Sequence, residues 1–345
     1  MSAVAIADLS RDLARLEESV RARASELLES QQVRMVIGHK RAWNGPLAVA
    51  HFAVSPKEAR KFAAGPHCTG GLAKYLLEER EKDGVVAVIA RGCDALGVRR
   101  LLIDRRVDAE KVLVLGVPCA GCLDPAKLAE ALGVTPAELV EVTLAAGALR
   151  VRLAGQEQAA AGPPLDKVLP PTCMACEVRM PVEVAEMLGG DLAALTALAG
   201  RPPAIDLETA EAEVTRLEEL SADDRYAYWA GHFQRCLRCF ACRNACPACN
   251  CRVCALDSYD PKWLGHPTEI PEQFMFHFIR AVDVAGRCVA CGECERACPV
   301  GLPLMQLNRK FSKDIRTLFG VDRPHLPGEH EPLGKFEPDD PEEFM

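Results

Sequence analysis

A cysteine pattern, CxxCxxCxxxCP, occurs twice in this chain and constrains its fold more than any other feature of the sequence. Three cysteines spaced by two residues can wrap one metal centre within a single tight loop, and a proline, Pro247 or Pro299, ends each loop. Gly292, inside the second copy, suits the backbone conformations that such a loop demands. The repeat therefore predicts a metal-containing domain over residues 231–315. Its cysteines are Cys236, Cys239, Cys242 and Cys246 in the first copy and Cys288, Cys291, Cys294 and Cys298 in the second.

The fourth cysteine of each copy is expected to bind the metal centre of the other copy. In two-cluster ferredoxins this pattern gives three thiolates to one 4Fe-4S cluster, and the fourth thiolate reaches the second cluster. A pair of zinc sites is the alternative, because CxxC pairs also bind zinc, although zinc sites usually take two pairs and not three cysteines plus one. The expected ligand sets are Cys236, Cys239, Cys242 and Cys298 for one cluster, and Cys288, Cys291, Cys294 and Cys246 for the other.

The seventeen cysteines of the chain favour metal binding over disulfides. No N-terminal stretch has the basic and apolar regions of a signal peptide. We therefore expect a cytoplasmic protein, in which thiols stay reduced. Three further cysteines, Cys249, Cys251 and Cys254, lie between the two copies. The simplest interpretation makes them packed thiols, and an additional metal site is the alternative.

Residues 33–200 alternate short apolar runs with helical patterns, which is typical of βαβ units around a parallel sheet. The predicted fold class is α/β, with a parallel or mixed α/β domain followed by a helical connector over 201–230 and a ferredoxin-like α-helical domain over 231–315. Residues 139–153 predict a hairpin, expected as an antiparallel addition. Strands are expected at 33–38, 47–54, 85–90 and 111–117, and helices at 69–81 and 94–107.

The two ends of the chain have different patterns. Residues 1–32 contain an amphipathic helix whose apolar stripe includes Leu9, Leu13 and Leu16. We expect this helix to pack on its own domain, with docking or dimerisation as the alternative. Residues 316–345 are acidic and rich in proline, which predicts a surface tail or a segment that is ordered by a partner.

A second group of cysteines belongs to the α/β domain. Cys93 and Cys119 each follow an apolar run, so a right-handed crossover would place both at the carboxyl ends of neighbouring parallel strands, where such sheets bind ligands. Cys122 and the pair Cys173 and Cys176 make five thiols for one centre with four ligands. Strand-end geometry favours Cys93, Cys119, Cys173 and Cys176. Spacing alone favours Cys122 in place of Cys93, a set that zinc would accept equally.

Thr69, Gly70 and Gly71 stand at the start of the helix predicted at 69–81. Free N–H groups and the helix dipole attract phosphate at such a position, so the phosphate of a nucleotide or flavin is a candidate ligand. A tight turn or close helix packing explains the two glycines equally well.

Composition excludes several functions. A formal net charge of -8 argues against a general affinity for nucleic acid, whose phosphates need a basic surface. No apolar run approaches the ~20 residues of a membrane-spanning helix. No set of Ser, His, Asp or Cys side chains has the pattern of a catalytic nucleophile, so we predict no catalytic residues.

The segments around these cysteines resemble a known family. "GPHCTGGLAKYLLEE", "ARGCDALGVRRLLIDRRV", "VLGVPCAGC" and "PTCMACEVRMP" resemble the coenzyme F420 hydrogenase/dehydrogenase beta subunits. The two cysteine repeats resemble the dicluster module fused to some members associated with formate dehydrogenases, hydrogenases or heterodisulfide-reductase-like complexes. The resemblance spans roughly residues 30–315. It implies a third 4Fe-4S cluster on Cys93, Cys119, Cys173 and Cys176, and often FAD, with its phosphate at Thr69, Gly70 and Gly71.

Three hypotheses for function follow. The first is an iron-sulfur subunit that relays electrons through about three 4Fe-4S clusters to an acceptor from a catalytic partner subunit of an oxidoreductase complex. The second is a flavin-containing oxidoreductase subunit that exchanges hydride with a diffusible carrier and splits it into single electrons for the clusters. The third is a zinc scaffold for the assembly of partner proteins.

Overall fold

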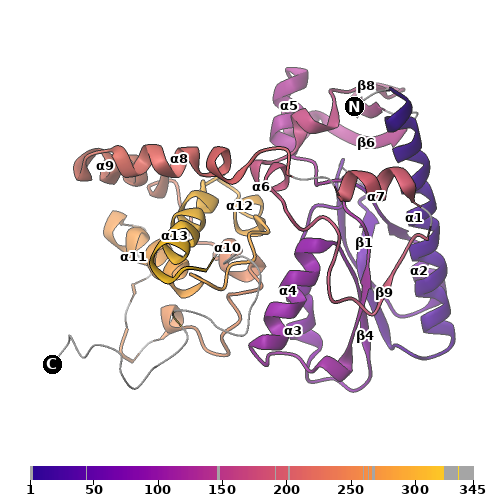
Figure 1. Cartoon of the computed structure of the whole chain (residues 1–345), viewed down its shortest axis with the longest axis horizontal. Helices are drawn as coiled ribbons and strands as arrows, with labels where there is room; N and C mark the ends of the chain where they lie inside the picture. Colours follow the sequence, from indigo (N-terminus) through magenta and orange to yellow (C-terminus); the bar gives the residue numbers. More distant parts are fainter. Residues whose placement is uncertain are drawn as a thin grey trace. The chain divides into compact units, whose positions relative to one another are not determined.

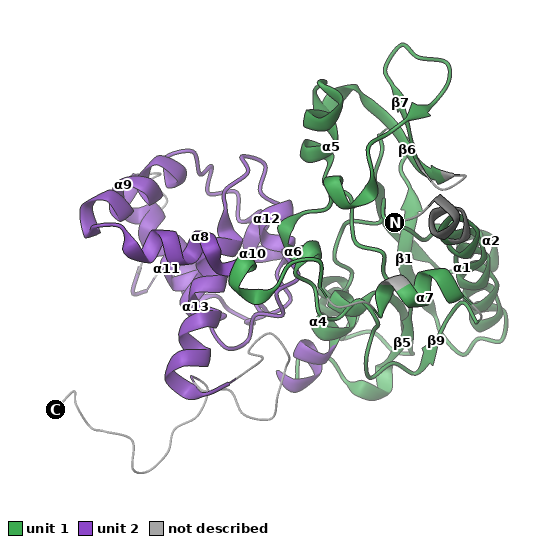
Figure 2. Ribbon diagram, turned by 45° about the horizontal axis from the view of Figure 1, so that its top comes forward, with its two compact units in different colours: residues 1–98, 105–210 green, residues 99–104, 211–345 purple. Residues whose placement is uncertain are grey.

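The computed structural model forms two compact units (Figure 2). Unit 1 consists of residues 1–98 and 105–210, and unit 2 of residues 99–104 and 211–345. Of the predicted acidic tail, residues 316–319 still belong to the last helix, whereas residues 322–332 and 334–345 lie outside the described part of the chain. The structure describes residues 3–43, 45–145, 148–190, 192–200, 203–258, 260–262, 264–265, 269–321 and 333.

A mixed sheet is the centre of unit 1. The strands predicted at 85–90 and 111–117 are confirmed as the parallel pair β4 and β5, and β4 is buried at every position, as expected for a strand covered on both faces. The order is β2-β1-β4-β5-β9, in which β1, β4, β5 and β9 are parallel, while β2 and β3 pair antiparallel with β1. The strands are β1 (Met35–Arg41), β2 (Ala48–Ala53), β3 (Phe62–Ala63), β4 (Val86–Ala90), β5 (Val112–Gly116) and β9 (Glu186–Met187).

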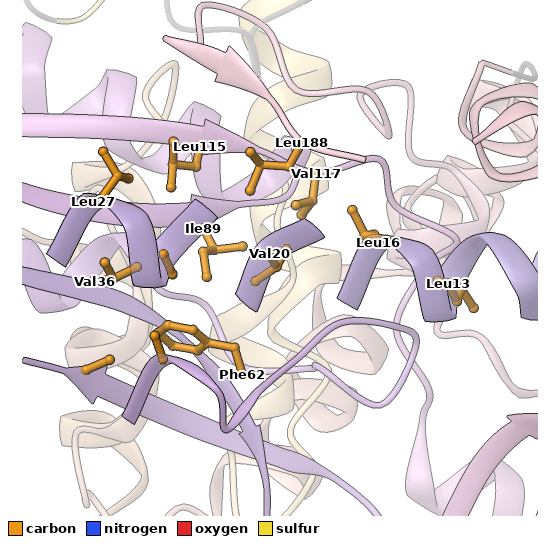
Figure 3. Packing of buried hydrophobic residues seen from close by; sticks show 14 of the residues in the cluster. Leu13, Leu16, Val20, Leu27, Val36, Phe62, Ile89, Leu115, Val117 and Leu188 are labelled. Atoms are coloured by element: carbon orange, nitrogen blue, oxygen red, sulfur yellow. The ribbon is translucent and has the colours of Figure 1, made fainter. Parts of the chain in front are cut away.

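Helix α1 (Ala3–Glu29) covers one face of this sheet. Its leucine stripe points at the strands, and each fully buried leucine contributes about 1.5–3 kcal/mol to folding. The stripe therefore packs on its own unit and is not a free docking face. The side chains of this core in Figure 3 include Leu13, Leu16, Val20 and Leu27 of the helix, with Val36, Phe62, Ile89 and Leu115 of the strands.

Helix α4 (Gly92–Ile103) connects β4 to β5 and lies on the other side of the sheet from α1 (Figure 1). The helix predicted at 94–107 is therefore present, whereas the one predicted at 69–81 is reduced to a 3-10 turn at Ala73–Tyr75 and the four-residue α3 (Leu76–Glu79). Asp94 accepts a hydrogen bond from the Leu72 N–H, which holds the preceding glycines in a loop. The other helices of unit 1 are α2 (Pro56–Ala59), α5 (Pro125–Leu132), α6 (Pro171–Met174) and α7 (Ala193–Ala199).

The predicted hairpin is present, but it does not join the main sheet. β6 (Leu139–Ala145) and β7 (Ala148–Leu153) are antiparallel, and β8 (Ala160–Ala161) pairs with β7 in a separate sheet. The hairpin's turn at 146–147 lies outside the described residues. Apolar residues of α5 cover this small sheet, so the hairpin buries its apolar face without the main sheet.

Unit 2 consists of helices joined by the cysteine loops. Its core combines Trp229, Phe233 and Phe276 with the thiols of Cys242 and Cys294. The connector predicted over 201–230 is helical, as α8 and most of α9. None of the described helices is long and apolar enough to cross a membrane. The helices are α8 (Leu207–Glu219), α9 (Ala222–Phe233), α10 (Ala241–Ala245), α11 (Ile270–Asp283), α12 (Glu293–Arg296) and α13 (Leu304–Phe319).

Candidate metal centres

The two cysteine repeats of unit 2 share one backbone conformation. Arg238 and Ala290 directly precede the second cysteine of their repeats, Phe240 and Gly292 directly follow it, and all four have positive φ. Phe240 and Gly292 then begin α10 and α12, which contact each other. The left-handed backbone conformation is unfavourable by about 1–2 kcal/mol for a residue that has a side chain. Three such residues adopt it here, so the loop geometry is imposed by the surrounding fold and not by local preference.

The first repeat lies next to the last cysteine of the second repeat. Cys236 interacts electrostatically with Cys298 and Cys239, and Cys242 interacts with Cys236 and Cys298. Cys236, Cys242 and Cys298 also pack in one apolar cluster, which Cys294 of the second set shares, and burial raises the pKa of Cys242 to about 11. The structure therefore places Cys236, Cys242 and Cys298 together, whereas Cys239 is exposed.

Cys246, the last cysteine of the first repeat, lies next to the second repeat. It packs with Cys288 in a separate cluster beside Val284. Burial, with Cys246 close by, raises the pKa of Cys288 to about 11, and burial also raises the pKa of Cys294, next to Cys246 and Cys288. Cys291 follows Ala290 in the loop and is half-buried. The fourth cysteine of each repeat is thus placed with the other repeat.

Backbone N–H groups point at several of these sulfurs. The Arg238 N–H donates to Cys236 Sγ at 3.4 Å, and the Leu302 N–H donates to Cys298 Sγ at 3.3 Å. Hydrogen bonds to sulfur stabilise thiolates and help to set the potential of an iron-sulfur centre. Half-buried thiols that face N–H donors, as Cys236 and Cys298 do, therefore fit the chemistry of a 4Fe-4S ligand set.

Polar side chains of α11 surround Cys236. The buried Gln273 donates from Nε2 to the Cys236 carbonyl at 2.9 Å and accepts from Arg238 Nε at 3.0 Å. His277 Nε2 lies 3.3 Å from Cys236 Sγ. Burial lowers the pKa of His277 to about 3. The ring is therefore neutral and, with its proton on Nε2, donates to the sulfur. No pattern in the sequence indicated this position for either residue.

Cys249, Cys251 and Cys254 are placed separately. Cys249 forms a side-chain hydrogen bond with Cys246, which lowers the pKa of Cys246 to about 6. Cys254 hydrogen-bonds with Arg243. Cys251 is exposed, so the expectation of a packed thiol is wrong for this residue and suits Cys249 better.

Unit 1 gathers its cysteines at the carboxyl ends of β4 and β5. Cys93 lies in the first turn of α4, which follows β4, and Cys119 lies just after β5. The Cys119 N–H donates to the Arg179 carbonyl at 3.0 Å, which ties this loop to the segment that carries Cys173 and Cys176. The Cys176 N–H donates to the Cys173 carbonyl at 3.4 Å, so these two residues form a turn.

Cys122 differs from the other cysteines at this edge. It is buried, whereas Cys93, Cys119, Cys173 and Cys176 are half-buried. Its Sγ accepts from Arg91 Nη1 at 3.0 Å and donates to the Cys68 carbonyl at 3.4 Å. Both candidates for the fourth ligand lie near Cys119. Cys122 forms a side-chain hydrogen bond with Cys119, and Cys93 interacts electrostatically with Cys119.

Two charged residues of the "RGCD" segment organise this edge. Asp94 accepts from Arg91 Nε at 2.7 Å and from the Leu72 N–H at 2.8 Å. Arg91 also donates to the carbonyls of Gly70 and Cys68. Burial acts to lower the pKa of Arg91, but the charges of Asp94 and nearby thiols more than offset it, so the pKa is raised. Their position directly after an apolar strand was the only signal for these residues in the sequence.

Thr69, Gly70 and Gly71 do not begin a long helix. The Leu72 N–H is bound to Asp94, and the Gly70 carbonyl accepts from Arg91 and lies 2.8 Å from His39 Nε2. A nearby cavity is lined by residues that include His39, Arg91 and Cys119. The described geometry therefore offers a flavin phosphate no helix terminus.

Within the described ranges, no group of three or more His, Cys, Asp or Glu side chains could hold a metal ion as it stands. Some cysteines of each expected set lie close to one another, such as Cys236 with Cys298, Cys246 with Cys288, and Cys119 with Cys93. Metal binding would remove thiol protons in a step coupled to folding. The ligand sets therefore stay predictions.

This chain is similar to a known protein family and to several known proteins. The family model for the C terminus of coenzyme F420 hydrogenase/dehydrogenase beta subunits matches residues 83–196. The F420-dependent formate dehydrogenase subunit beta of Methanocaldococcus jannaschii is 24% identical over 350 residues, which cover 88% of this chain and 89% of the relative. The F420-dependent formate dehydrogenase 1 subunit beta of Methanococcus maripaludis is 21% identical over 358 residues, with coverage of 89% and 90%.

Among solved structures, a chain of the F420-reducing [NiFe] hydrogenase complex of Methanosarcina barkeri matches at 16% identity and a TM-score of 0.35. The match covers 47% of this chain and 61% of that chain.

Proposed function

The chain belongs to the coenzyme F420 hydrogenase/dehydrogenase beta-subunit family, and from this premise we propose that it is an iron-sulfur electron-transfer subunit of a multisubunit oxidoreductase complex. It relays electrons through about three 4Fe-4S clusters between a catalytic partner subunit and an acceptor. That partner is of the formate dehydrogenase, hydrogenase or heterodisulfide-reductase type. The named relatives, which are beta subunits of F420-dependent formate dehydrogenases, support this choice of partner.

The crossed placement of Cys246 and Cys298 is the observation that carries the proposal. Each lies beside the cysteines of the other repeat, which is the arrangement that two-cluster ferredoxins require. Bound 4Fe-4S clusters would supply reversible one-electron transfer. The chain's own cysteines would hold the centres through thiolates, and backbone N–H groups donate to the sulfurs of Cys236 and Cys298. No proton transfer by a side chain is required.

The centre proposed in unit 1 uses Cys93, Cys119, Cys173 and Cys176. All four are half-buried at one edge of the sheet, and the hydrogen bond between Cys119 and Arg179 holds two of their segments together. Cys122 donates from Sγ to the Cys68 carbonyl at 3.4 Å, which only the protonated thiol can do. This contact supports Cys122 as a structural thiol and Cys93 as the fourth ligand.

The metal content of the whole chain tests the proposed function. Protein purified without oxygen is expected to contain about twelve iron and about twelve sulfide per chain, because each of about three clusters holds four of each. Chemical analysis of iron, sulfide and zinc is the measurement. Stoichiometric zinc in place of iron would refute electron transfer and favour a scaffold.

Cys93→Ala and Cys122→Ala are expected to differ, because only Cys93 is proposed as a ligand. Cys93→Ala should lower the iron content to about eight per chain, and Cys122→Ala should keep about twelve. Iron analysis and the EPR spectrum of the reduced protein measure the difference. Cys68→Ala is the matched control, since Cys68 is a buried thiol of the same region. The opposite result, with iron lost only from Cys122→Ala, would show that Cys122 is the ligand.

A further inference from the structure

Arg280 is a buried cation that lacks a polar partner in the described part of the chain. It lies in α11 with 2% of its surface exposed, and Nε, Nη1 and Nη2 have no hydrogen-bond partner among the described residues. A guanidinium cannot lose its proton in a protein, so it stays charged. A buried charge without compensation is strongly destabilising. Negative charge must therefore face this side chain in the folded protein.

Cysteines of both repeats pack on either side of Arg280 along α11 and, as ligands of bound clusters, would supply this negative charge. Phe276, one turn before Arg280, packs with Cys242 and Cys294. Val284, one turn after it, packs with Cys246 and Cys288. Burial acts to lower the pKa of Arg280, but Cys294, Cys242, Cys246 and Cys249 raise it by more. Cys242 belongs to the first expected ligand set, and Cys246 and Cys294 belong to the second. Arg280 thus lies within electrostatic reach of both sets.

We infer that Arg280 is the shared counter-charge of the two metal centres of unit 2 and that it raises the reduction potential of both. This inference deepens the proposed function and rests on it. A 4Fe-4S cluster with four thiolates carries about two negative charges and gains one more on reduction. A nearby positive charge therefore stabilises the reduced form more than the oxidised form. The effect is strong at a buried site, where the dielectric constant is low.

Arg238 is the useful contrast, because it is a buried arginine within the first repeat, between Cys236 and Cys239. Its Nε donates to Gln273 Oε1 at 3.0 Å, and its guanidinium lies 5.0 Å from the centre of the Phe276 ring. Burial raises the pKa of Cys236, and the positive charge of Arg238 acts to lower it. Arg238 therefore has neutral partners and a position by the first centre, whereas Arg280 faces both centres.

Redox titrations of the whole chain, purified without oxygen and followed by EPR, test the inference. In Arg280→Gln, the midpoint potentials of both centres in unit 2 are expected to shift to lower values. Arg280→Lys keeps the charge and should stay close to wild type. Arg238→Gln should shift the first centre by more than the second. Unchanged midpoints in Arg280→Gln, or a shift of one centre alone, would overturn the inference.

Iron content decides the case in which Arg280→Gln fails to retain its clusters. Arg280→Met removes the charge but keeps an unbranched side chain. The inference expects Arg280→Lys to retain the iron of unit 2 and Arg280→Met to lose it. If Arg280→Met retained the iron with wild-type midpoints, or Arg280→Lys lost it as Arg280→Met does, the charge would not be the cause. Wild-type protein without iron and sulfide would instead refute the proposed function itself.

Discussion

Cys298→Ala is expected to remove the centre built by the first repeat, although Cys298 belongs to the second. Cys298 lies against Cys236 and Cys242, so its loss takes the fourth ligand from that centre. Iron should fall from about twelve to about eight per chain. The remaining EPR spectrum should match that of Cys239→Ala and differ from that of Cys291→Ala, since the latter should lack the other centre.

Pairs of substitutions test this prediction more strictly, because the loss of a second ligand from the same centre should not lower the iron content any further. Cys239→Ala combined with Cys298→Ala should still leave about eight iron per chain. Cys291→Ala combined with Cys298→Ala should leave about four, since that pair damages both centres. If each repeat served only its own centre, the two results would be exchanged and the crossed ligand sets would be wrong.

Long patterns in the sequence predicted the framework of the fold. The leucines of α1 recur at helical spacing, and the runs that became β4 and β5 are continuously apolar. The burial of apolar side chains determines such elements, and it appears in the sequence as a regular spacing or a continuous run of apolar residues. The neighbourhood of Cys246 and Cys298 was predictable for another reason, because a spacing of three cysteines plus one admits few ways of surrounding a metal centre.

Short segments and buried charges could not be predicted in the same way. In the segment expected as a helix at 69–81, Asp94, on another element, binds the Leu72 N–H, and only a 3-10 turn and the four-residue α3 follow. The pairing of Arg91 with Asp94, and the placement of Arg280 by thiols of both repeats, depend on residues that only the fold brings together. In the sequence, an arginine after a strand or inside an amphipathic helix looks like an ordinary surface cation.

Gly92 links the backbone of unit 1 to its candidate centre. A Cβ atom at Gly92 would lie 1.7 Å from the Val178 carbonyl oxygen. A backbone atom cannot rotate away as a side chain can, so the segment around Val178 would have to move. That segment includes Cys176 and also Arg179, whose carbonyl binds the Cys119 N–H. A single methyl group at this position should therefore disturb both packing and the ligand set.

Gly92→Ala is accordingly expected to destabilise the protein by about 3 kcal/mol, at the upper end of the cost of overpacking. It should also lower the iron content from about twelve to about eight per chain, because the thiols of unit 1 no longer converge. Thermal unfolding and iron analysis measure the two effects. Gly231→Ala is the matched control, since no neighbouring atom lies within 4 Å of a Cβ there and alanine favours helix α9. A Gly92→Ala protein with wild-type stability and full iron would show that the contact with Val178 does not position the centre.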